Sequence, residues 1–119
     1  MATLLRLLDY RRKARPVFFT RPELNQLLSM YSRRVMRGEW RDYAIDLQEN
    51  SVRFSIFRHS QERPLYAIVK FAPGTGRQGD YAMLSGPQRL AAGGSLGEVL
   101  QALQRHLPAV EPVDIEKYR

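Results

Sequence analysis

Cysteine is missing from this 119-residue chain, and its absence removes several classes of function. Without cysteine the chain can form no disulfide, no thiolate nucleophile and no zinc site that includes a cysteine ligand. The composition is compatible with a reducing compartment, because disulfides persist mainly in oxidising ones. Chemistry that depends on a thiol is therefore excluded.

Long apolar runs are also missing. No segment approaches the ~20 apolar residues that a membrane-spanning helix needs. The apolar stretch from Leu4 to Leu8 is interrupted by Arg6 and is followed by a basic cluster, whereas a secretory signal has its charge before the apolar region. We expect neither a membrane span nor an export signal. A mitochondrial-type presequence is a second interpretation, because this segment is rich in arginine and holds a single acid.

Residue combinations that carry catalysis or bind metals are scarce. The two histidines, His59 and His106, have no carboxylate or second histidine at ligand spacing. Asp42 and Asp46 would lie about 13 Å apart on a strand at ~3.3 Å per residue, which is too far for joint acid–base work. The glycine-rich run at 74–77 lacks the Lys-Ser/Thr pair of a phosphate loop. We therefore expect no enzyme activity, no metal and no cofactor.

What is present is the composition of one globular domain with an uneven distribution of charge. The chain is 44% hydrophobic and 26% charged, and its formal net charge is +7. Six basic side chains and one acid fall within residues 1–21, whereas the other 98 residues hold 13 basic and 11 acidic side chains. We predict a basic N-terminal arm over residues 1–16, a single domain over 17–108 and a tail over 109–119.

A helix is predicted to begin after Thr20. The run Thr20-Arg21-Pro22-Glu23 matches a capping box, in which the hydroxyl and the carboxylate each accept a backbone N–H of the other residue. Apolar residues then recur at helical spacing, and Gly38 supplies a C-terminal stop. The expected core stripe is Leu24, Leu27, Leu28, Tyr31 and Val35.

Alternating residues predict an antiparallel meander after this helix. Two alternating runs, 43–47 and 52–57, flank the turn residues at 49–51 and read as a hairpin. A third strand is expected over 65–71 and a short fourth over 81–84, with brief pairing at 89–92. A second capping box, Ser95-Leu96-Gly97-Glu98, opens a helix that Pro108 ends. The predicted fold is α+β: a helix, an antiparallel three- to four-stranded meander and a helix, with both helices packed on the sheet.

Two sets of residues are candidates for binding a partner. Trp40, Arg41 and Tyr43 could form a stacking surface for a base or a peptide. The alternative is that Trp40 is half-buried and closes the junction between the helix and the first strand. The second set is basic and consists of Arg11, Arg12, Lys13, Arg33, Arg34 and Arg37.

The turn Gly93-Gly94-Ser95 is a candidate anion site. It precedes a helix, so its backbone N–H groups could hold an anion at the positive end of the helix dipole. The alternative is an ordinary helix start, because most helices begin in this way without binding anything.

Several local runs together resemble one family. They are Phe19-Thr20-Arg21-Pro22-Glu23-Leu24-Asn25, Gly38-Glu39-Trp40-Arg41-Asp42-Tyr43-Ala44-Ile45-Asp46, Phe54-Ser55-Ile56-Phe57-Arg58, Arg63-Pro64-Leu65-Tyr66 and Arg77-Gln78-Gly79. From Val17 to Leu103 the chain resembles a family of short alphaproteobacterial proteins catalogued as domain of unknown function 2794. The resemblance implies a bacterial cytoplasmic setting. It implies no activity and assigns no role to any residue.

Two non-catalytic functions fit these features. The first is a protein-interaction module or small regulator, which the four leucines of the arm favour because nucleic acid does not need them. The second is a nucleic-acid-binding module that uses the basic arm and an arginine face. We favour a protein partner, since the charge outside the arm is nearly balanced. The sequence predicts no oligomeric state.

Overall fold

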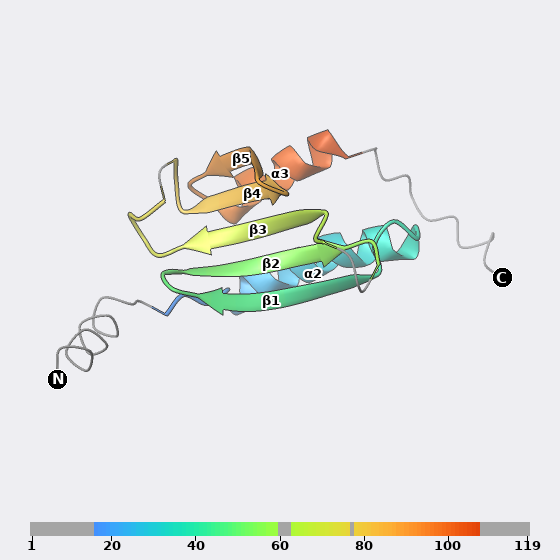
Figure 1. Cartoon of the computed structure of the whole chain (residues 1–119), viewed down its shortest axis with the longest axis horizontal. Coiled ribbons are helices and arrows are strands. Elements are labelled where there is room, and N and C mark those ends of the chain that lie inside the picture. The colour runs from blue at the N-terminus through green and yellow to red at the C-terminus, as the bar shows by residue number, and fades with distance from the viewer. Residues whose placement is uncertain (1–15, 60–62, 77, 108–119) are drawn as a thin grey trace.

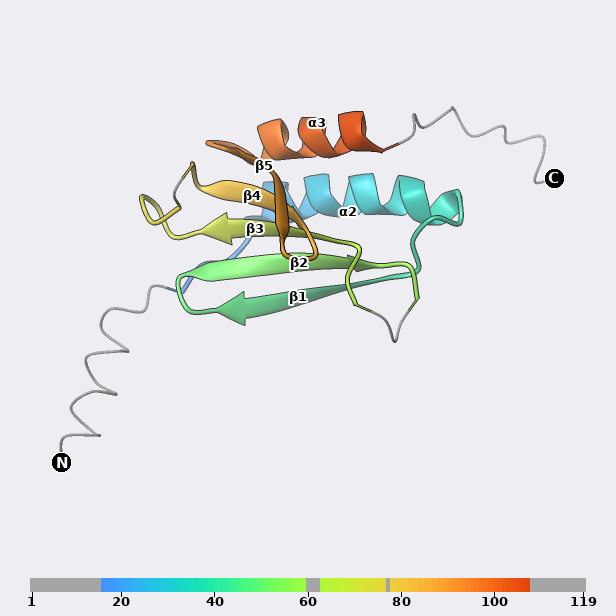
Figure 2. The same ribbon diagram turned by 45° about the horizontal axis from the view of Figure 1, so that its top comes forward.

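Two helices lie on one face of a five-stranded antiparallel sheet in the computed structural model (Figure 1, Figure 2). The structure describes residues 16–59, 63–76 and 78–107. The elements in chain order are α2 (Arg21–Met36), β1 (Asp42–Gln48), β2 (Ser51–Phe57), β3 (Tyr66–Phe71), β4 (Tyr81–Ser85), β5 (Gln88–Gly93) and α3 (Leu96–His106). The predicted α+β class and the packing of both helices on the sheet are confirmed.

The sheet is a meander in which each strand pairs with the next, in the order β1-β2-β3-β4-β5. The expected count of three to four strands is too low, because Gln88–Gly93 forms a full fifth strand on β4. Alanine and glycine in β5 have low strand propensity, which weakens the local signal. They pair because Gly86, with φ of +60°, closes a tight turn after β4 and because α3 packs against both strands.

Helix α2 begins and ends where its sequence predicts. Thr20 Oγ1 accepts a hydrogen bond from Glu23 N at 3.3 Å, and Glu23 Oε1 accepts one from Thr20 N at 2.8 Å. Gly38 has φ of +76° and its N–H donates to the carbonyl of Val35, while the following N–H donates to the carbonyl of Arg34. These bonds form a Schellman motif, which requires a residue in the left-handed region.

Residues 16–20, directly before α2, anchor the chain to the core and form no strand. Val17 and Phe19 are buried, whereas Phe18 between them is 58% exposed. Lys70 Nζ donates to the carbonyl oxygen of Phe18 at 3.0 Å and so ties this segment to β3. The segment therefore fixes the point at which the N-terminal arm meets the domain.

One apolar core fills the space between the sheet and the helices. Its largest fully buried side chains are Leu27, Val52, Phe54, Ile56, Ile68, Met83, Val99 and Leu103. The predicted stripe of α2 needs one correction, since Val35 is exposed while Met30 and Arg34 are buried. The buried face of α2 is displaced because Met30 turns toward α3, where it lines a depression together with Leu100. The described part of the chain contains no helix that is long and apolar enough to cross a membrane.

Candidate functional site

The first strand carries a row of exposed apolar side chains. Tyr43 is 40% exposed, Ile45 is 42% exposed and Leu47 is 61% exposed. In the sheet register they lie opposite Ile56, Phe54 and Val52, respectively, which are buried in the core. Because residues opposite each other on neighbouring strands share a face, the exposed row lies on the helix side of the sheet and extends the core beyond its covered part.

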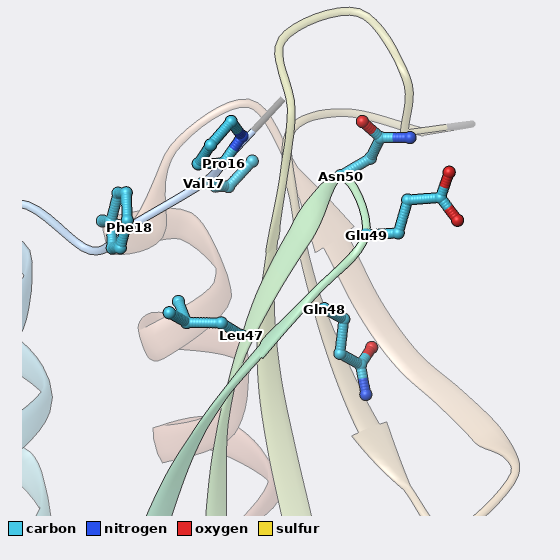
Figure 3. Close-up of a pocket in the computed structure, with 7 residues that line it drawn as sticks. All are labelled: Pro16, Val17, Phe18, Leu47, Gln48, Glu49 and Asn50. Carbon is cyan, nitrogen blue, oxygen red and sulfur yellow. The ribbon is translucent and has the colours of Figure 1, made fainter. Parts of the chain in front are cut away.

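A pocket lies at one end of this row. It has a volume of about 220 Å³ and is lined by Pro16, Val17, Phe18, Leu47, Gln48, Glu49 and Asn50 (Figure 3). The exposed ring of Phe18 adds to the apolar area there. We call Phe18, Tyr43, Ile45 and Leu47 the edge surface. Val35 and Met36, on the last turn of the helix that leads into β1, are also exposed.

The backbone of β1 is unpaired along its outer side within the described ranges, where β1 pairs with β2 alone. The two-residue turn Glu49-Asn50 makes Gln48 and Ser51 the terminal hydrogen-bonded pair of the hairpin. Such pairs alternate along an antiparallel ladder, so the N–H and C=O groups of the apolar row point outward. The N–H of Tyr43 agrees with this, because it donates to its neighbour Asp42 Oδ1 at 2.8 Å.

The opposite face of β1 is acidic. Asp42 and Asp46 are exposed on that face, and Glu49 follows in the turn. The ion pairs of the described residues join Glu39 to two arginines and Glu23 to Lys70, so neither aspartate belongs to one. The outer edge of the sheet therefore presents apolar side chains on one face and negative charge on the other.

The tryptophan named as a stacking candidate is part of the core. Trp40 is only 2% exposed, and its ring stacks on Tyr31 at a centroid distance of 6.1 Å. The geometry supports the alternative interpretation, in which Trp40 closes the junction between helix and strand. Arg41 is exposed. Tyr43 stacks on Phe54, with centroids 5.1 Å apart, and its ring lies 5.0 Å from that of Tyr31, yet the residue is 40% exposed.

The candidate arginines do not act as one free basic patch. Arg34 is 2% exposed and its Nη1 lies 3.0 Å from Glu39 Oε2. Arg37 Nε lies 3.1 Å from Oε1 of the same carboxylate, and Arg33 is exposed. One glutamate therefore neutralises part of this charge. The other three candidates, Arg11, Arg12 and Lys13, lie outside the described residues.

The candidate anion turn already holds a carboxylate of the chain itself. Ser95 Oγ accepts from Glu98 N at 3.3 Å, as the predicted cap requires, but the Glu98 carboxylate reaches past Ser95 to accept from Gly94 N at 3.3 Å. A Cβ at Gly93 would meet Glu98 Oε2, so the glycine leaves room for this contact. The negative charge of Glu98 occupies the place of an external anion and disfavours the binding of one.

A cluster of titratable groups joins the start of α2 to the sheet. Glu23 Oε1 lies 2.7 Å from Lys70 Nζ on β3, and the hydroxyl of Tyr81 on β4 donates to the same carboxylate. Burial alone raises the pKa of Glu23, but hydrogen bonds from Lys70, from the backbone of Thr20 and from Tyr81 outweigh it and lower the pKa below 4.5. Burial and the bond to Glu23 raise the pKa of Tyr81. Because these groups satisfy one another, the cluster anchors the helix.

The alternating pattern places Tyr43, Ile45 and Leu47 on one face of a strand. The sequence singled out Tyr43 as a candidate, together with Trp40 and Arg41, but not Ile45 or Leu47. Alternation predicts that one face of a strand is covered, and it does not say whether the strand lies at the edge of its sheet. Phe18 was missed for the same reason, since its exposure depends on how the segment packs. The described residues contain no group of side chains suited to hold a metal ion.

Comparisons with known proteins give one match. The family model described as "Protein of unknown function (DUF2794)" matches residues 17–100. Neither the curated proteins nor the solved structures contain a match. The candidate site therefore rests on its own geometry.

Proposed function

Since the chain belongs to the DUF2794 family of proteins of unknown function, which supplies no activity to transfer, we propose its function from the geometry of β1. It is a non-catalytic protein-interaction module that binds an extended segment of a partner protein along this strand. We place this activity in the bacterial cytoplasm, as the family resemblance implies.

The observation that carries the proposal is the unpaired edge of β1 with its exposed apolar row. An extended peptide that adds a strand gains main-chain hydrogen bonds from the outward N–H and C=O groups, and alternate side chains give specificity. Exposed apolar strand edges promote aggregation, so folded proteins normally cover or charge them. Here the row Tyr43, Ile45 and Leu47 stays exposed among the described residues, which supports a binding role.

The acidic face of β1 indicates the chemistry of the partner. A paired strand places its side chains beside Asp42 and Asp46 on one face and beside the apolar row on the other. Opposite charges on neighbouring strands stabilise a pair, and like charges destabilise it. The preferred partner segment therefore alternates apolar and basic residues.

The test is a peptide-binding measurement. Fluorescently labelled peptides that alternate valine with lysine, valine with glutamate or valine with serine are titrated with the full-length protein. We expect the lysine series to bind best, and we expect the double variant Ile45→Glu/Leu47→Glu to lose that binding. Equal binding of all three series, or unchanged binding by the variant, would contradict the proposal.

A matched control separates the edge surface from a general effect of added acid. Gln101 and Gln104 lie exposed on α3, on a different element from β1. The double variant Gln101→Glu/Gln104→Glu adds the same two negative charges there, and we expect it to keep peptide binding. Circular dichroism of each variant verifies that the fold is retained.

The alternative function is nucleic-acid binding through the basic arm and exposed arginines. The described residues offer it less support, because Arg34 is buried and shares Glu39 with Arg37. Binding through phosphate contacts weakens steeply as salt rises. Salt-sensitive anisotropy of a labelled DNA or RNA oligonucleotide would favour this function, and a flat titration at low salt excludes it.

The non-catalytic part of the proposal draws support from the Glu23 cluster. Catalytic acids and bases sit where a substrate can reach them. Glu23 already accepts from Lys70, Tyr81 and the backbone of Thr20, and its side chain is 13% exposed. Its bonds serve to hold α2 on the sheet.

A further inference from the structure

The N-terminal arm meets the domain at one end of the edge surface. Pro16 lines the same pocket as Leu47, the penultimate residue of β1 (Figure 3). Fifteen residues precede Pro16, and β1 has 7 residues. At ~3.3 Å per residue an extended arm exceeds the length of the strand. The arm therefore starts beside β1 and is long enough to run along all of it.

The arm and β1 have matching charge spacing. Arg11 and Arg15 are four residues apart, as are Asp42 and Asp46 on the strand. Pro16 and Leu47 line one pocket. In a parallel arrangement that sets residue 16 beside residue 47, Arg15 falls beside Asp46 and Arg11 falls beside Asp42. Since side chains alternate between the faces of a strand, both arginines then lie on the acidic face.

The same register suits the apolar face of β1. Arg12 falls beside Tyr43, where a guanidinium over an aromatic ring is a favourable contact. Ala14 falls beside Ile45 and adds no charge to the apolar row. The tether at residue 16 also helps, because a short linker raises the effective concentration of the arm at this edge to about the millimolar range.

A second copy of the chain fits the edge less well. Antiparallel pairing of two β1 strands about a twofold axis at Ile45 sets Asp46 of each strand diagonal to Asp42 and Asp46 of the other. Diagonal neighbours interact across a sheet, and like charges there are unfavourable. Charge complementarity therefore favours the arm over self-pairing.

We propose that residues 11–15 pair with β1 of the same chain as a sixth, parallel strand. The arm covers the surface that the proposed function assigns to a partner, so a partner segment must displace it. The proposal rests on the proposed function only in this consequence for regulation, and the pairing itself is tested without a partner.

The experiment uses the absence of cysteine, which makes a single introduced thiol the only attachment point. A nitroxide spin label is placed at Asp9→Cys in the otherwise unchanged, full-length, ¹⁵N-labelled protein. In the proposed register residue 9 lies beside residue 40, so the amide signals of Asp42 and Tyr43 lose more intensity than those of Leu47 and Gln48. A loose arm tethered at Pro16 gives the reverse order, and that result overturns the proposal.

Charge exchange tests the register itself. Arg11→Glu/Arg15→Glu is expected to move the signal loss toward Leu47, because the repelled arm is held only at Pro16. Adding Asp42→Arg/Asp46→Arg is expected to restore the original order, in which Asp42 and Tyr43 lose the most intensity. If the protein with exchanged charges does not recover this order, the pairs Arg11–Asp42 and Arg15–Asp46 are rejected. The matched control Arg21→Glu/Arg105→Glu changes the net charge equally and is expected to leave the order unchanged.

A mixed sample separates the same chain from a second copy. Spin-labelled protein without ¹⁵N is mixed with ¹⁵N-labelled protein that carries no spin label. We expect no loss at Asp42 or Tyr43, whereas loss there assigns the arm to another molecule and overturns the proposal. Peptide binding is measured separately. If a partner peptide binds but Asp42 and Tyr43 do not lose the most intensity, the sixth strand alone is rejected. If Asp42 and Tyr43 lose the most intensity but no peptide binds, the proposed function alone is rejected.

Discussion

At the residue scale, Glu23 has more roles than its place in the capping box suggests. Its carboxylate accepts from Thr20 N within the helix start and from Lys70 and Tyr81 on two strands. One side chain therefore caps the N-terminus of α2 and holds the helix on the sheet. The local pattern predicts only the first role, because Lys70 and Tyr81 are 47 and 58 residues away in the sequence.

Replacing Glu23 is expected to make the free energy of unfolding less dependent on pH in the acidic range. The pKa of Glu23 is lower in the folded state than its ordinary value of 4.5. Its stabilising effect is therefore complete above that value and disappears as the pH falls through the folded-state pKa. Glu23→Gln should lower the free energy of unfolding by about 1.5–3 kcal/mol at neutral pH, the range for hydrogen bonds to charged groups. Urea denaturation at a series of pH values should show this difference shrinking in acid.

Tyr81→Phe serves as the control for Glu23→Gln. It removes one donor to the carboxylate and leaves the ion pair with Lys70 in place. We expect the free energy of unfolding to fall by about 1.5–3 kcal/mol, since the lost bond is to a charged group, and we expect the acid dependence that Glu23 confers to be retained. A Glu23→Gln difference that stays constant across the pH series would contradict the assigned role of the charge.

Arg34 provides the second residue-scale prediction. It is buried and bonded to Glu39, so it serves the fold and is not accessible to a partner. Arg34→Ala should cost about 1.5–3 kcal/mol in the free energy of unfolding, since it leaves a carboxylate without its main partner. The exposed Arg33→Ala is the comparison and should change stability by less than about 0.5 kcal/mol. Equal effects of the two substitutions in urea denaturation would contradict this assignment.

At the element scale, neighbouring residues determine where α2 begins and ends, and packing determines which face of the helix is buried. The capping box and Gly38 mark the ends in the sequence, and the structure has both. The buried face is displaced toward Met30 and Arg34, because the helix contacts α3 as well as the sheet. Local chemistry determines where this helix begins and ends, and the neighbouring helix determines which side is covered.

The C-terminus of α2 gives an element-scale prediction. Gly38 has φ of +76°, and a Cβ there meets no atom within 4 Å, so a substitution is opposed by backbone strain alone. Gly38→Ala should therefore cost about 1–2 kcal/mol. Gly94→Ala is the comparison, since its backbone lies outside the left-handed region and its Cβ also has space. Thermal denaturation should show the larger loss for Gly38→Ala, and a larger loss for Gly94→Ala would contradict the cause.

At the scale of the whole molecule, one core joins both helices to a sheet that keeps one apolar edge exposed. Phe54 lies on β2 in this core and contacts the rings of Tyr31 on α2 and Tyr43 on β1. The core therefore continues into the edge surface through a ring stack. Disturbing the core should affect the edge, whereas changes at the edge should leave the core intact.

Phe54→Ala and Leu47→Ala compare the contribution of the core to stability with that of the edge. Phe54 is fully buried, so the substitution should cost about 3–5 kcal/mol. Leu47→Ala removes a side chain that is 61% exposed and should cost far less, about 1 kcal/mol or below. Urea denaturation measures both losses. Comparable losses would mean that Leu47 is more deeply packed than its exposure indicates.

The sequence by itself determined the features that depend on neighbouring residues. Helix ends follow from caps only a few residues away, and the hairpin follows from two alternating runs around a polar turn. The α+β class follows from the order of these elements. The short β5, rich in alanine and glycine, was underestimated because its pairing depends on packing against α3.

Only the tertiary structure decided which predicted residues are accessible. It buried Trp40 and Arg34, filled the glycine turn before α3 with the Glu98 carboxylate, and left Ile45 and Leu47 exposed. The physical reason is that exposure depends on long-range contacts: which strand lies at the edge, and how far a helix extends over it. The alternation of β1 identifies a strand, but its position at the edge of the sheet makes it a candidate binding site.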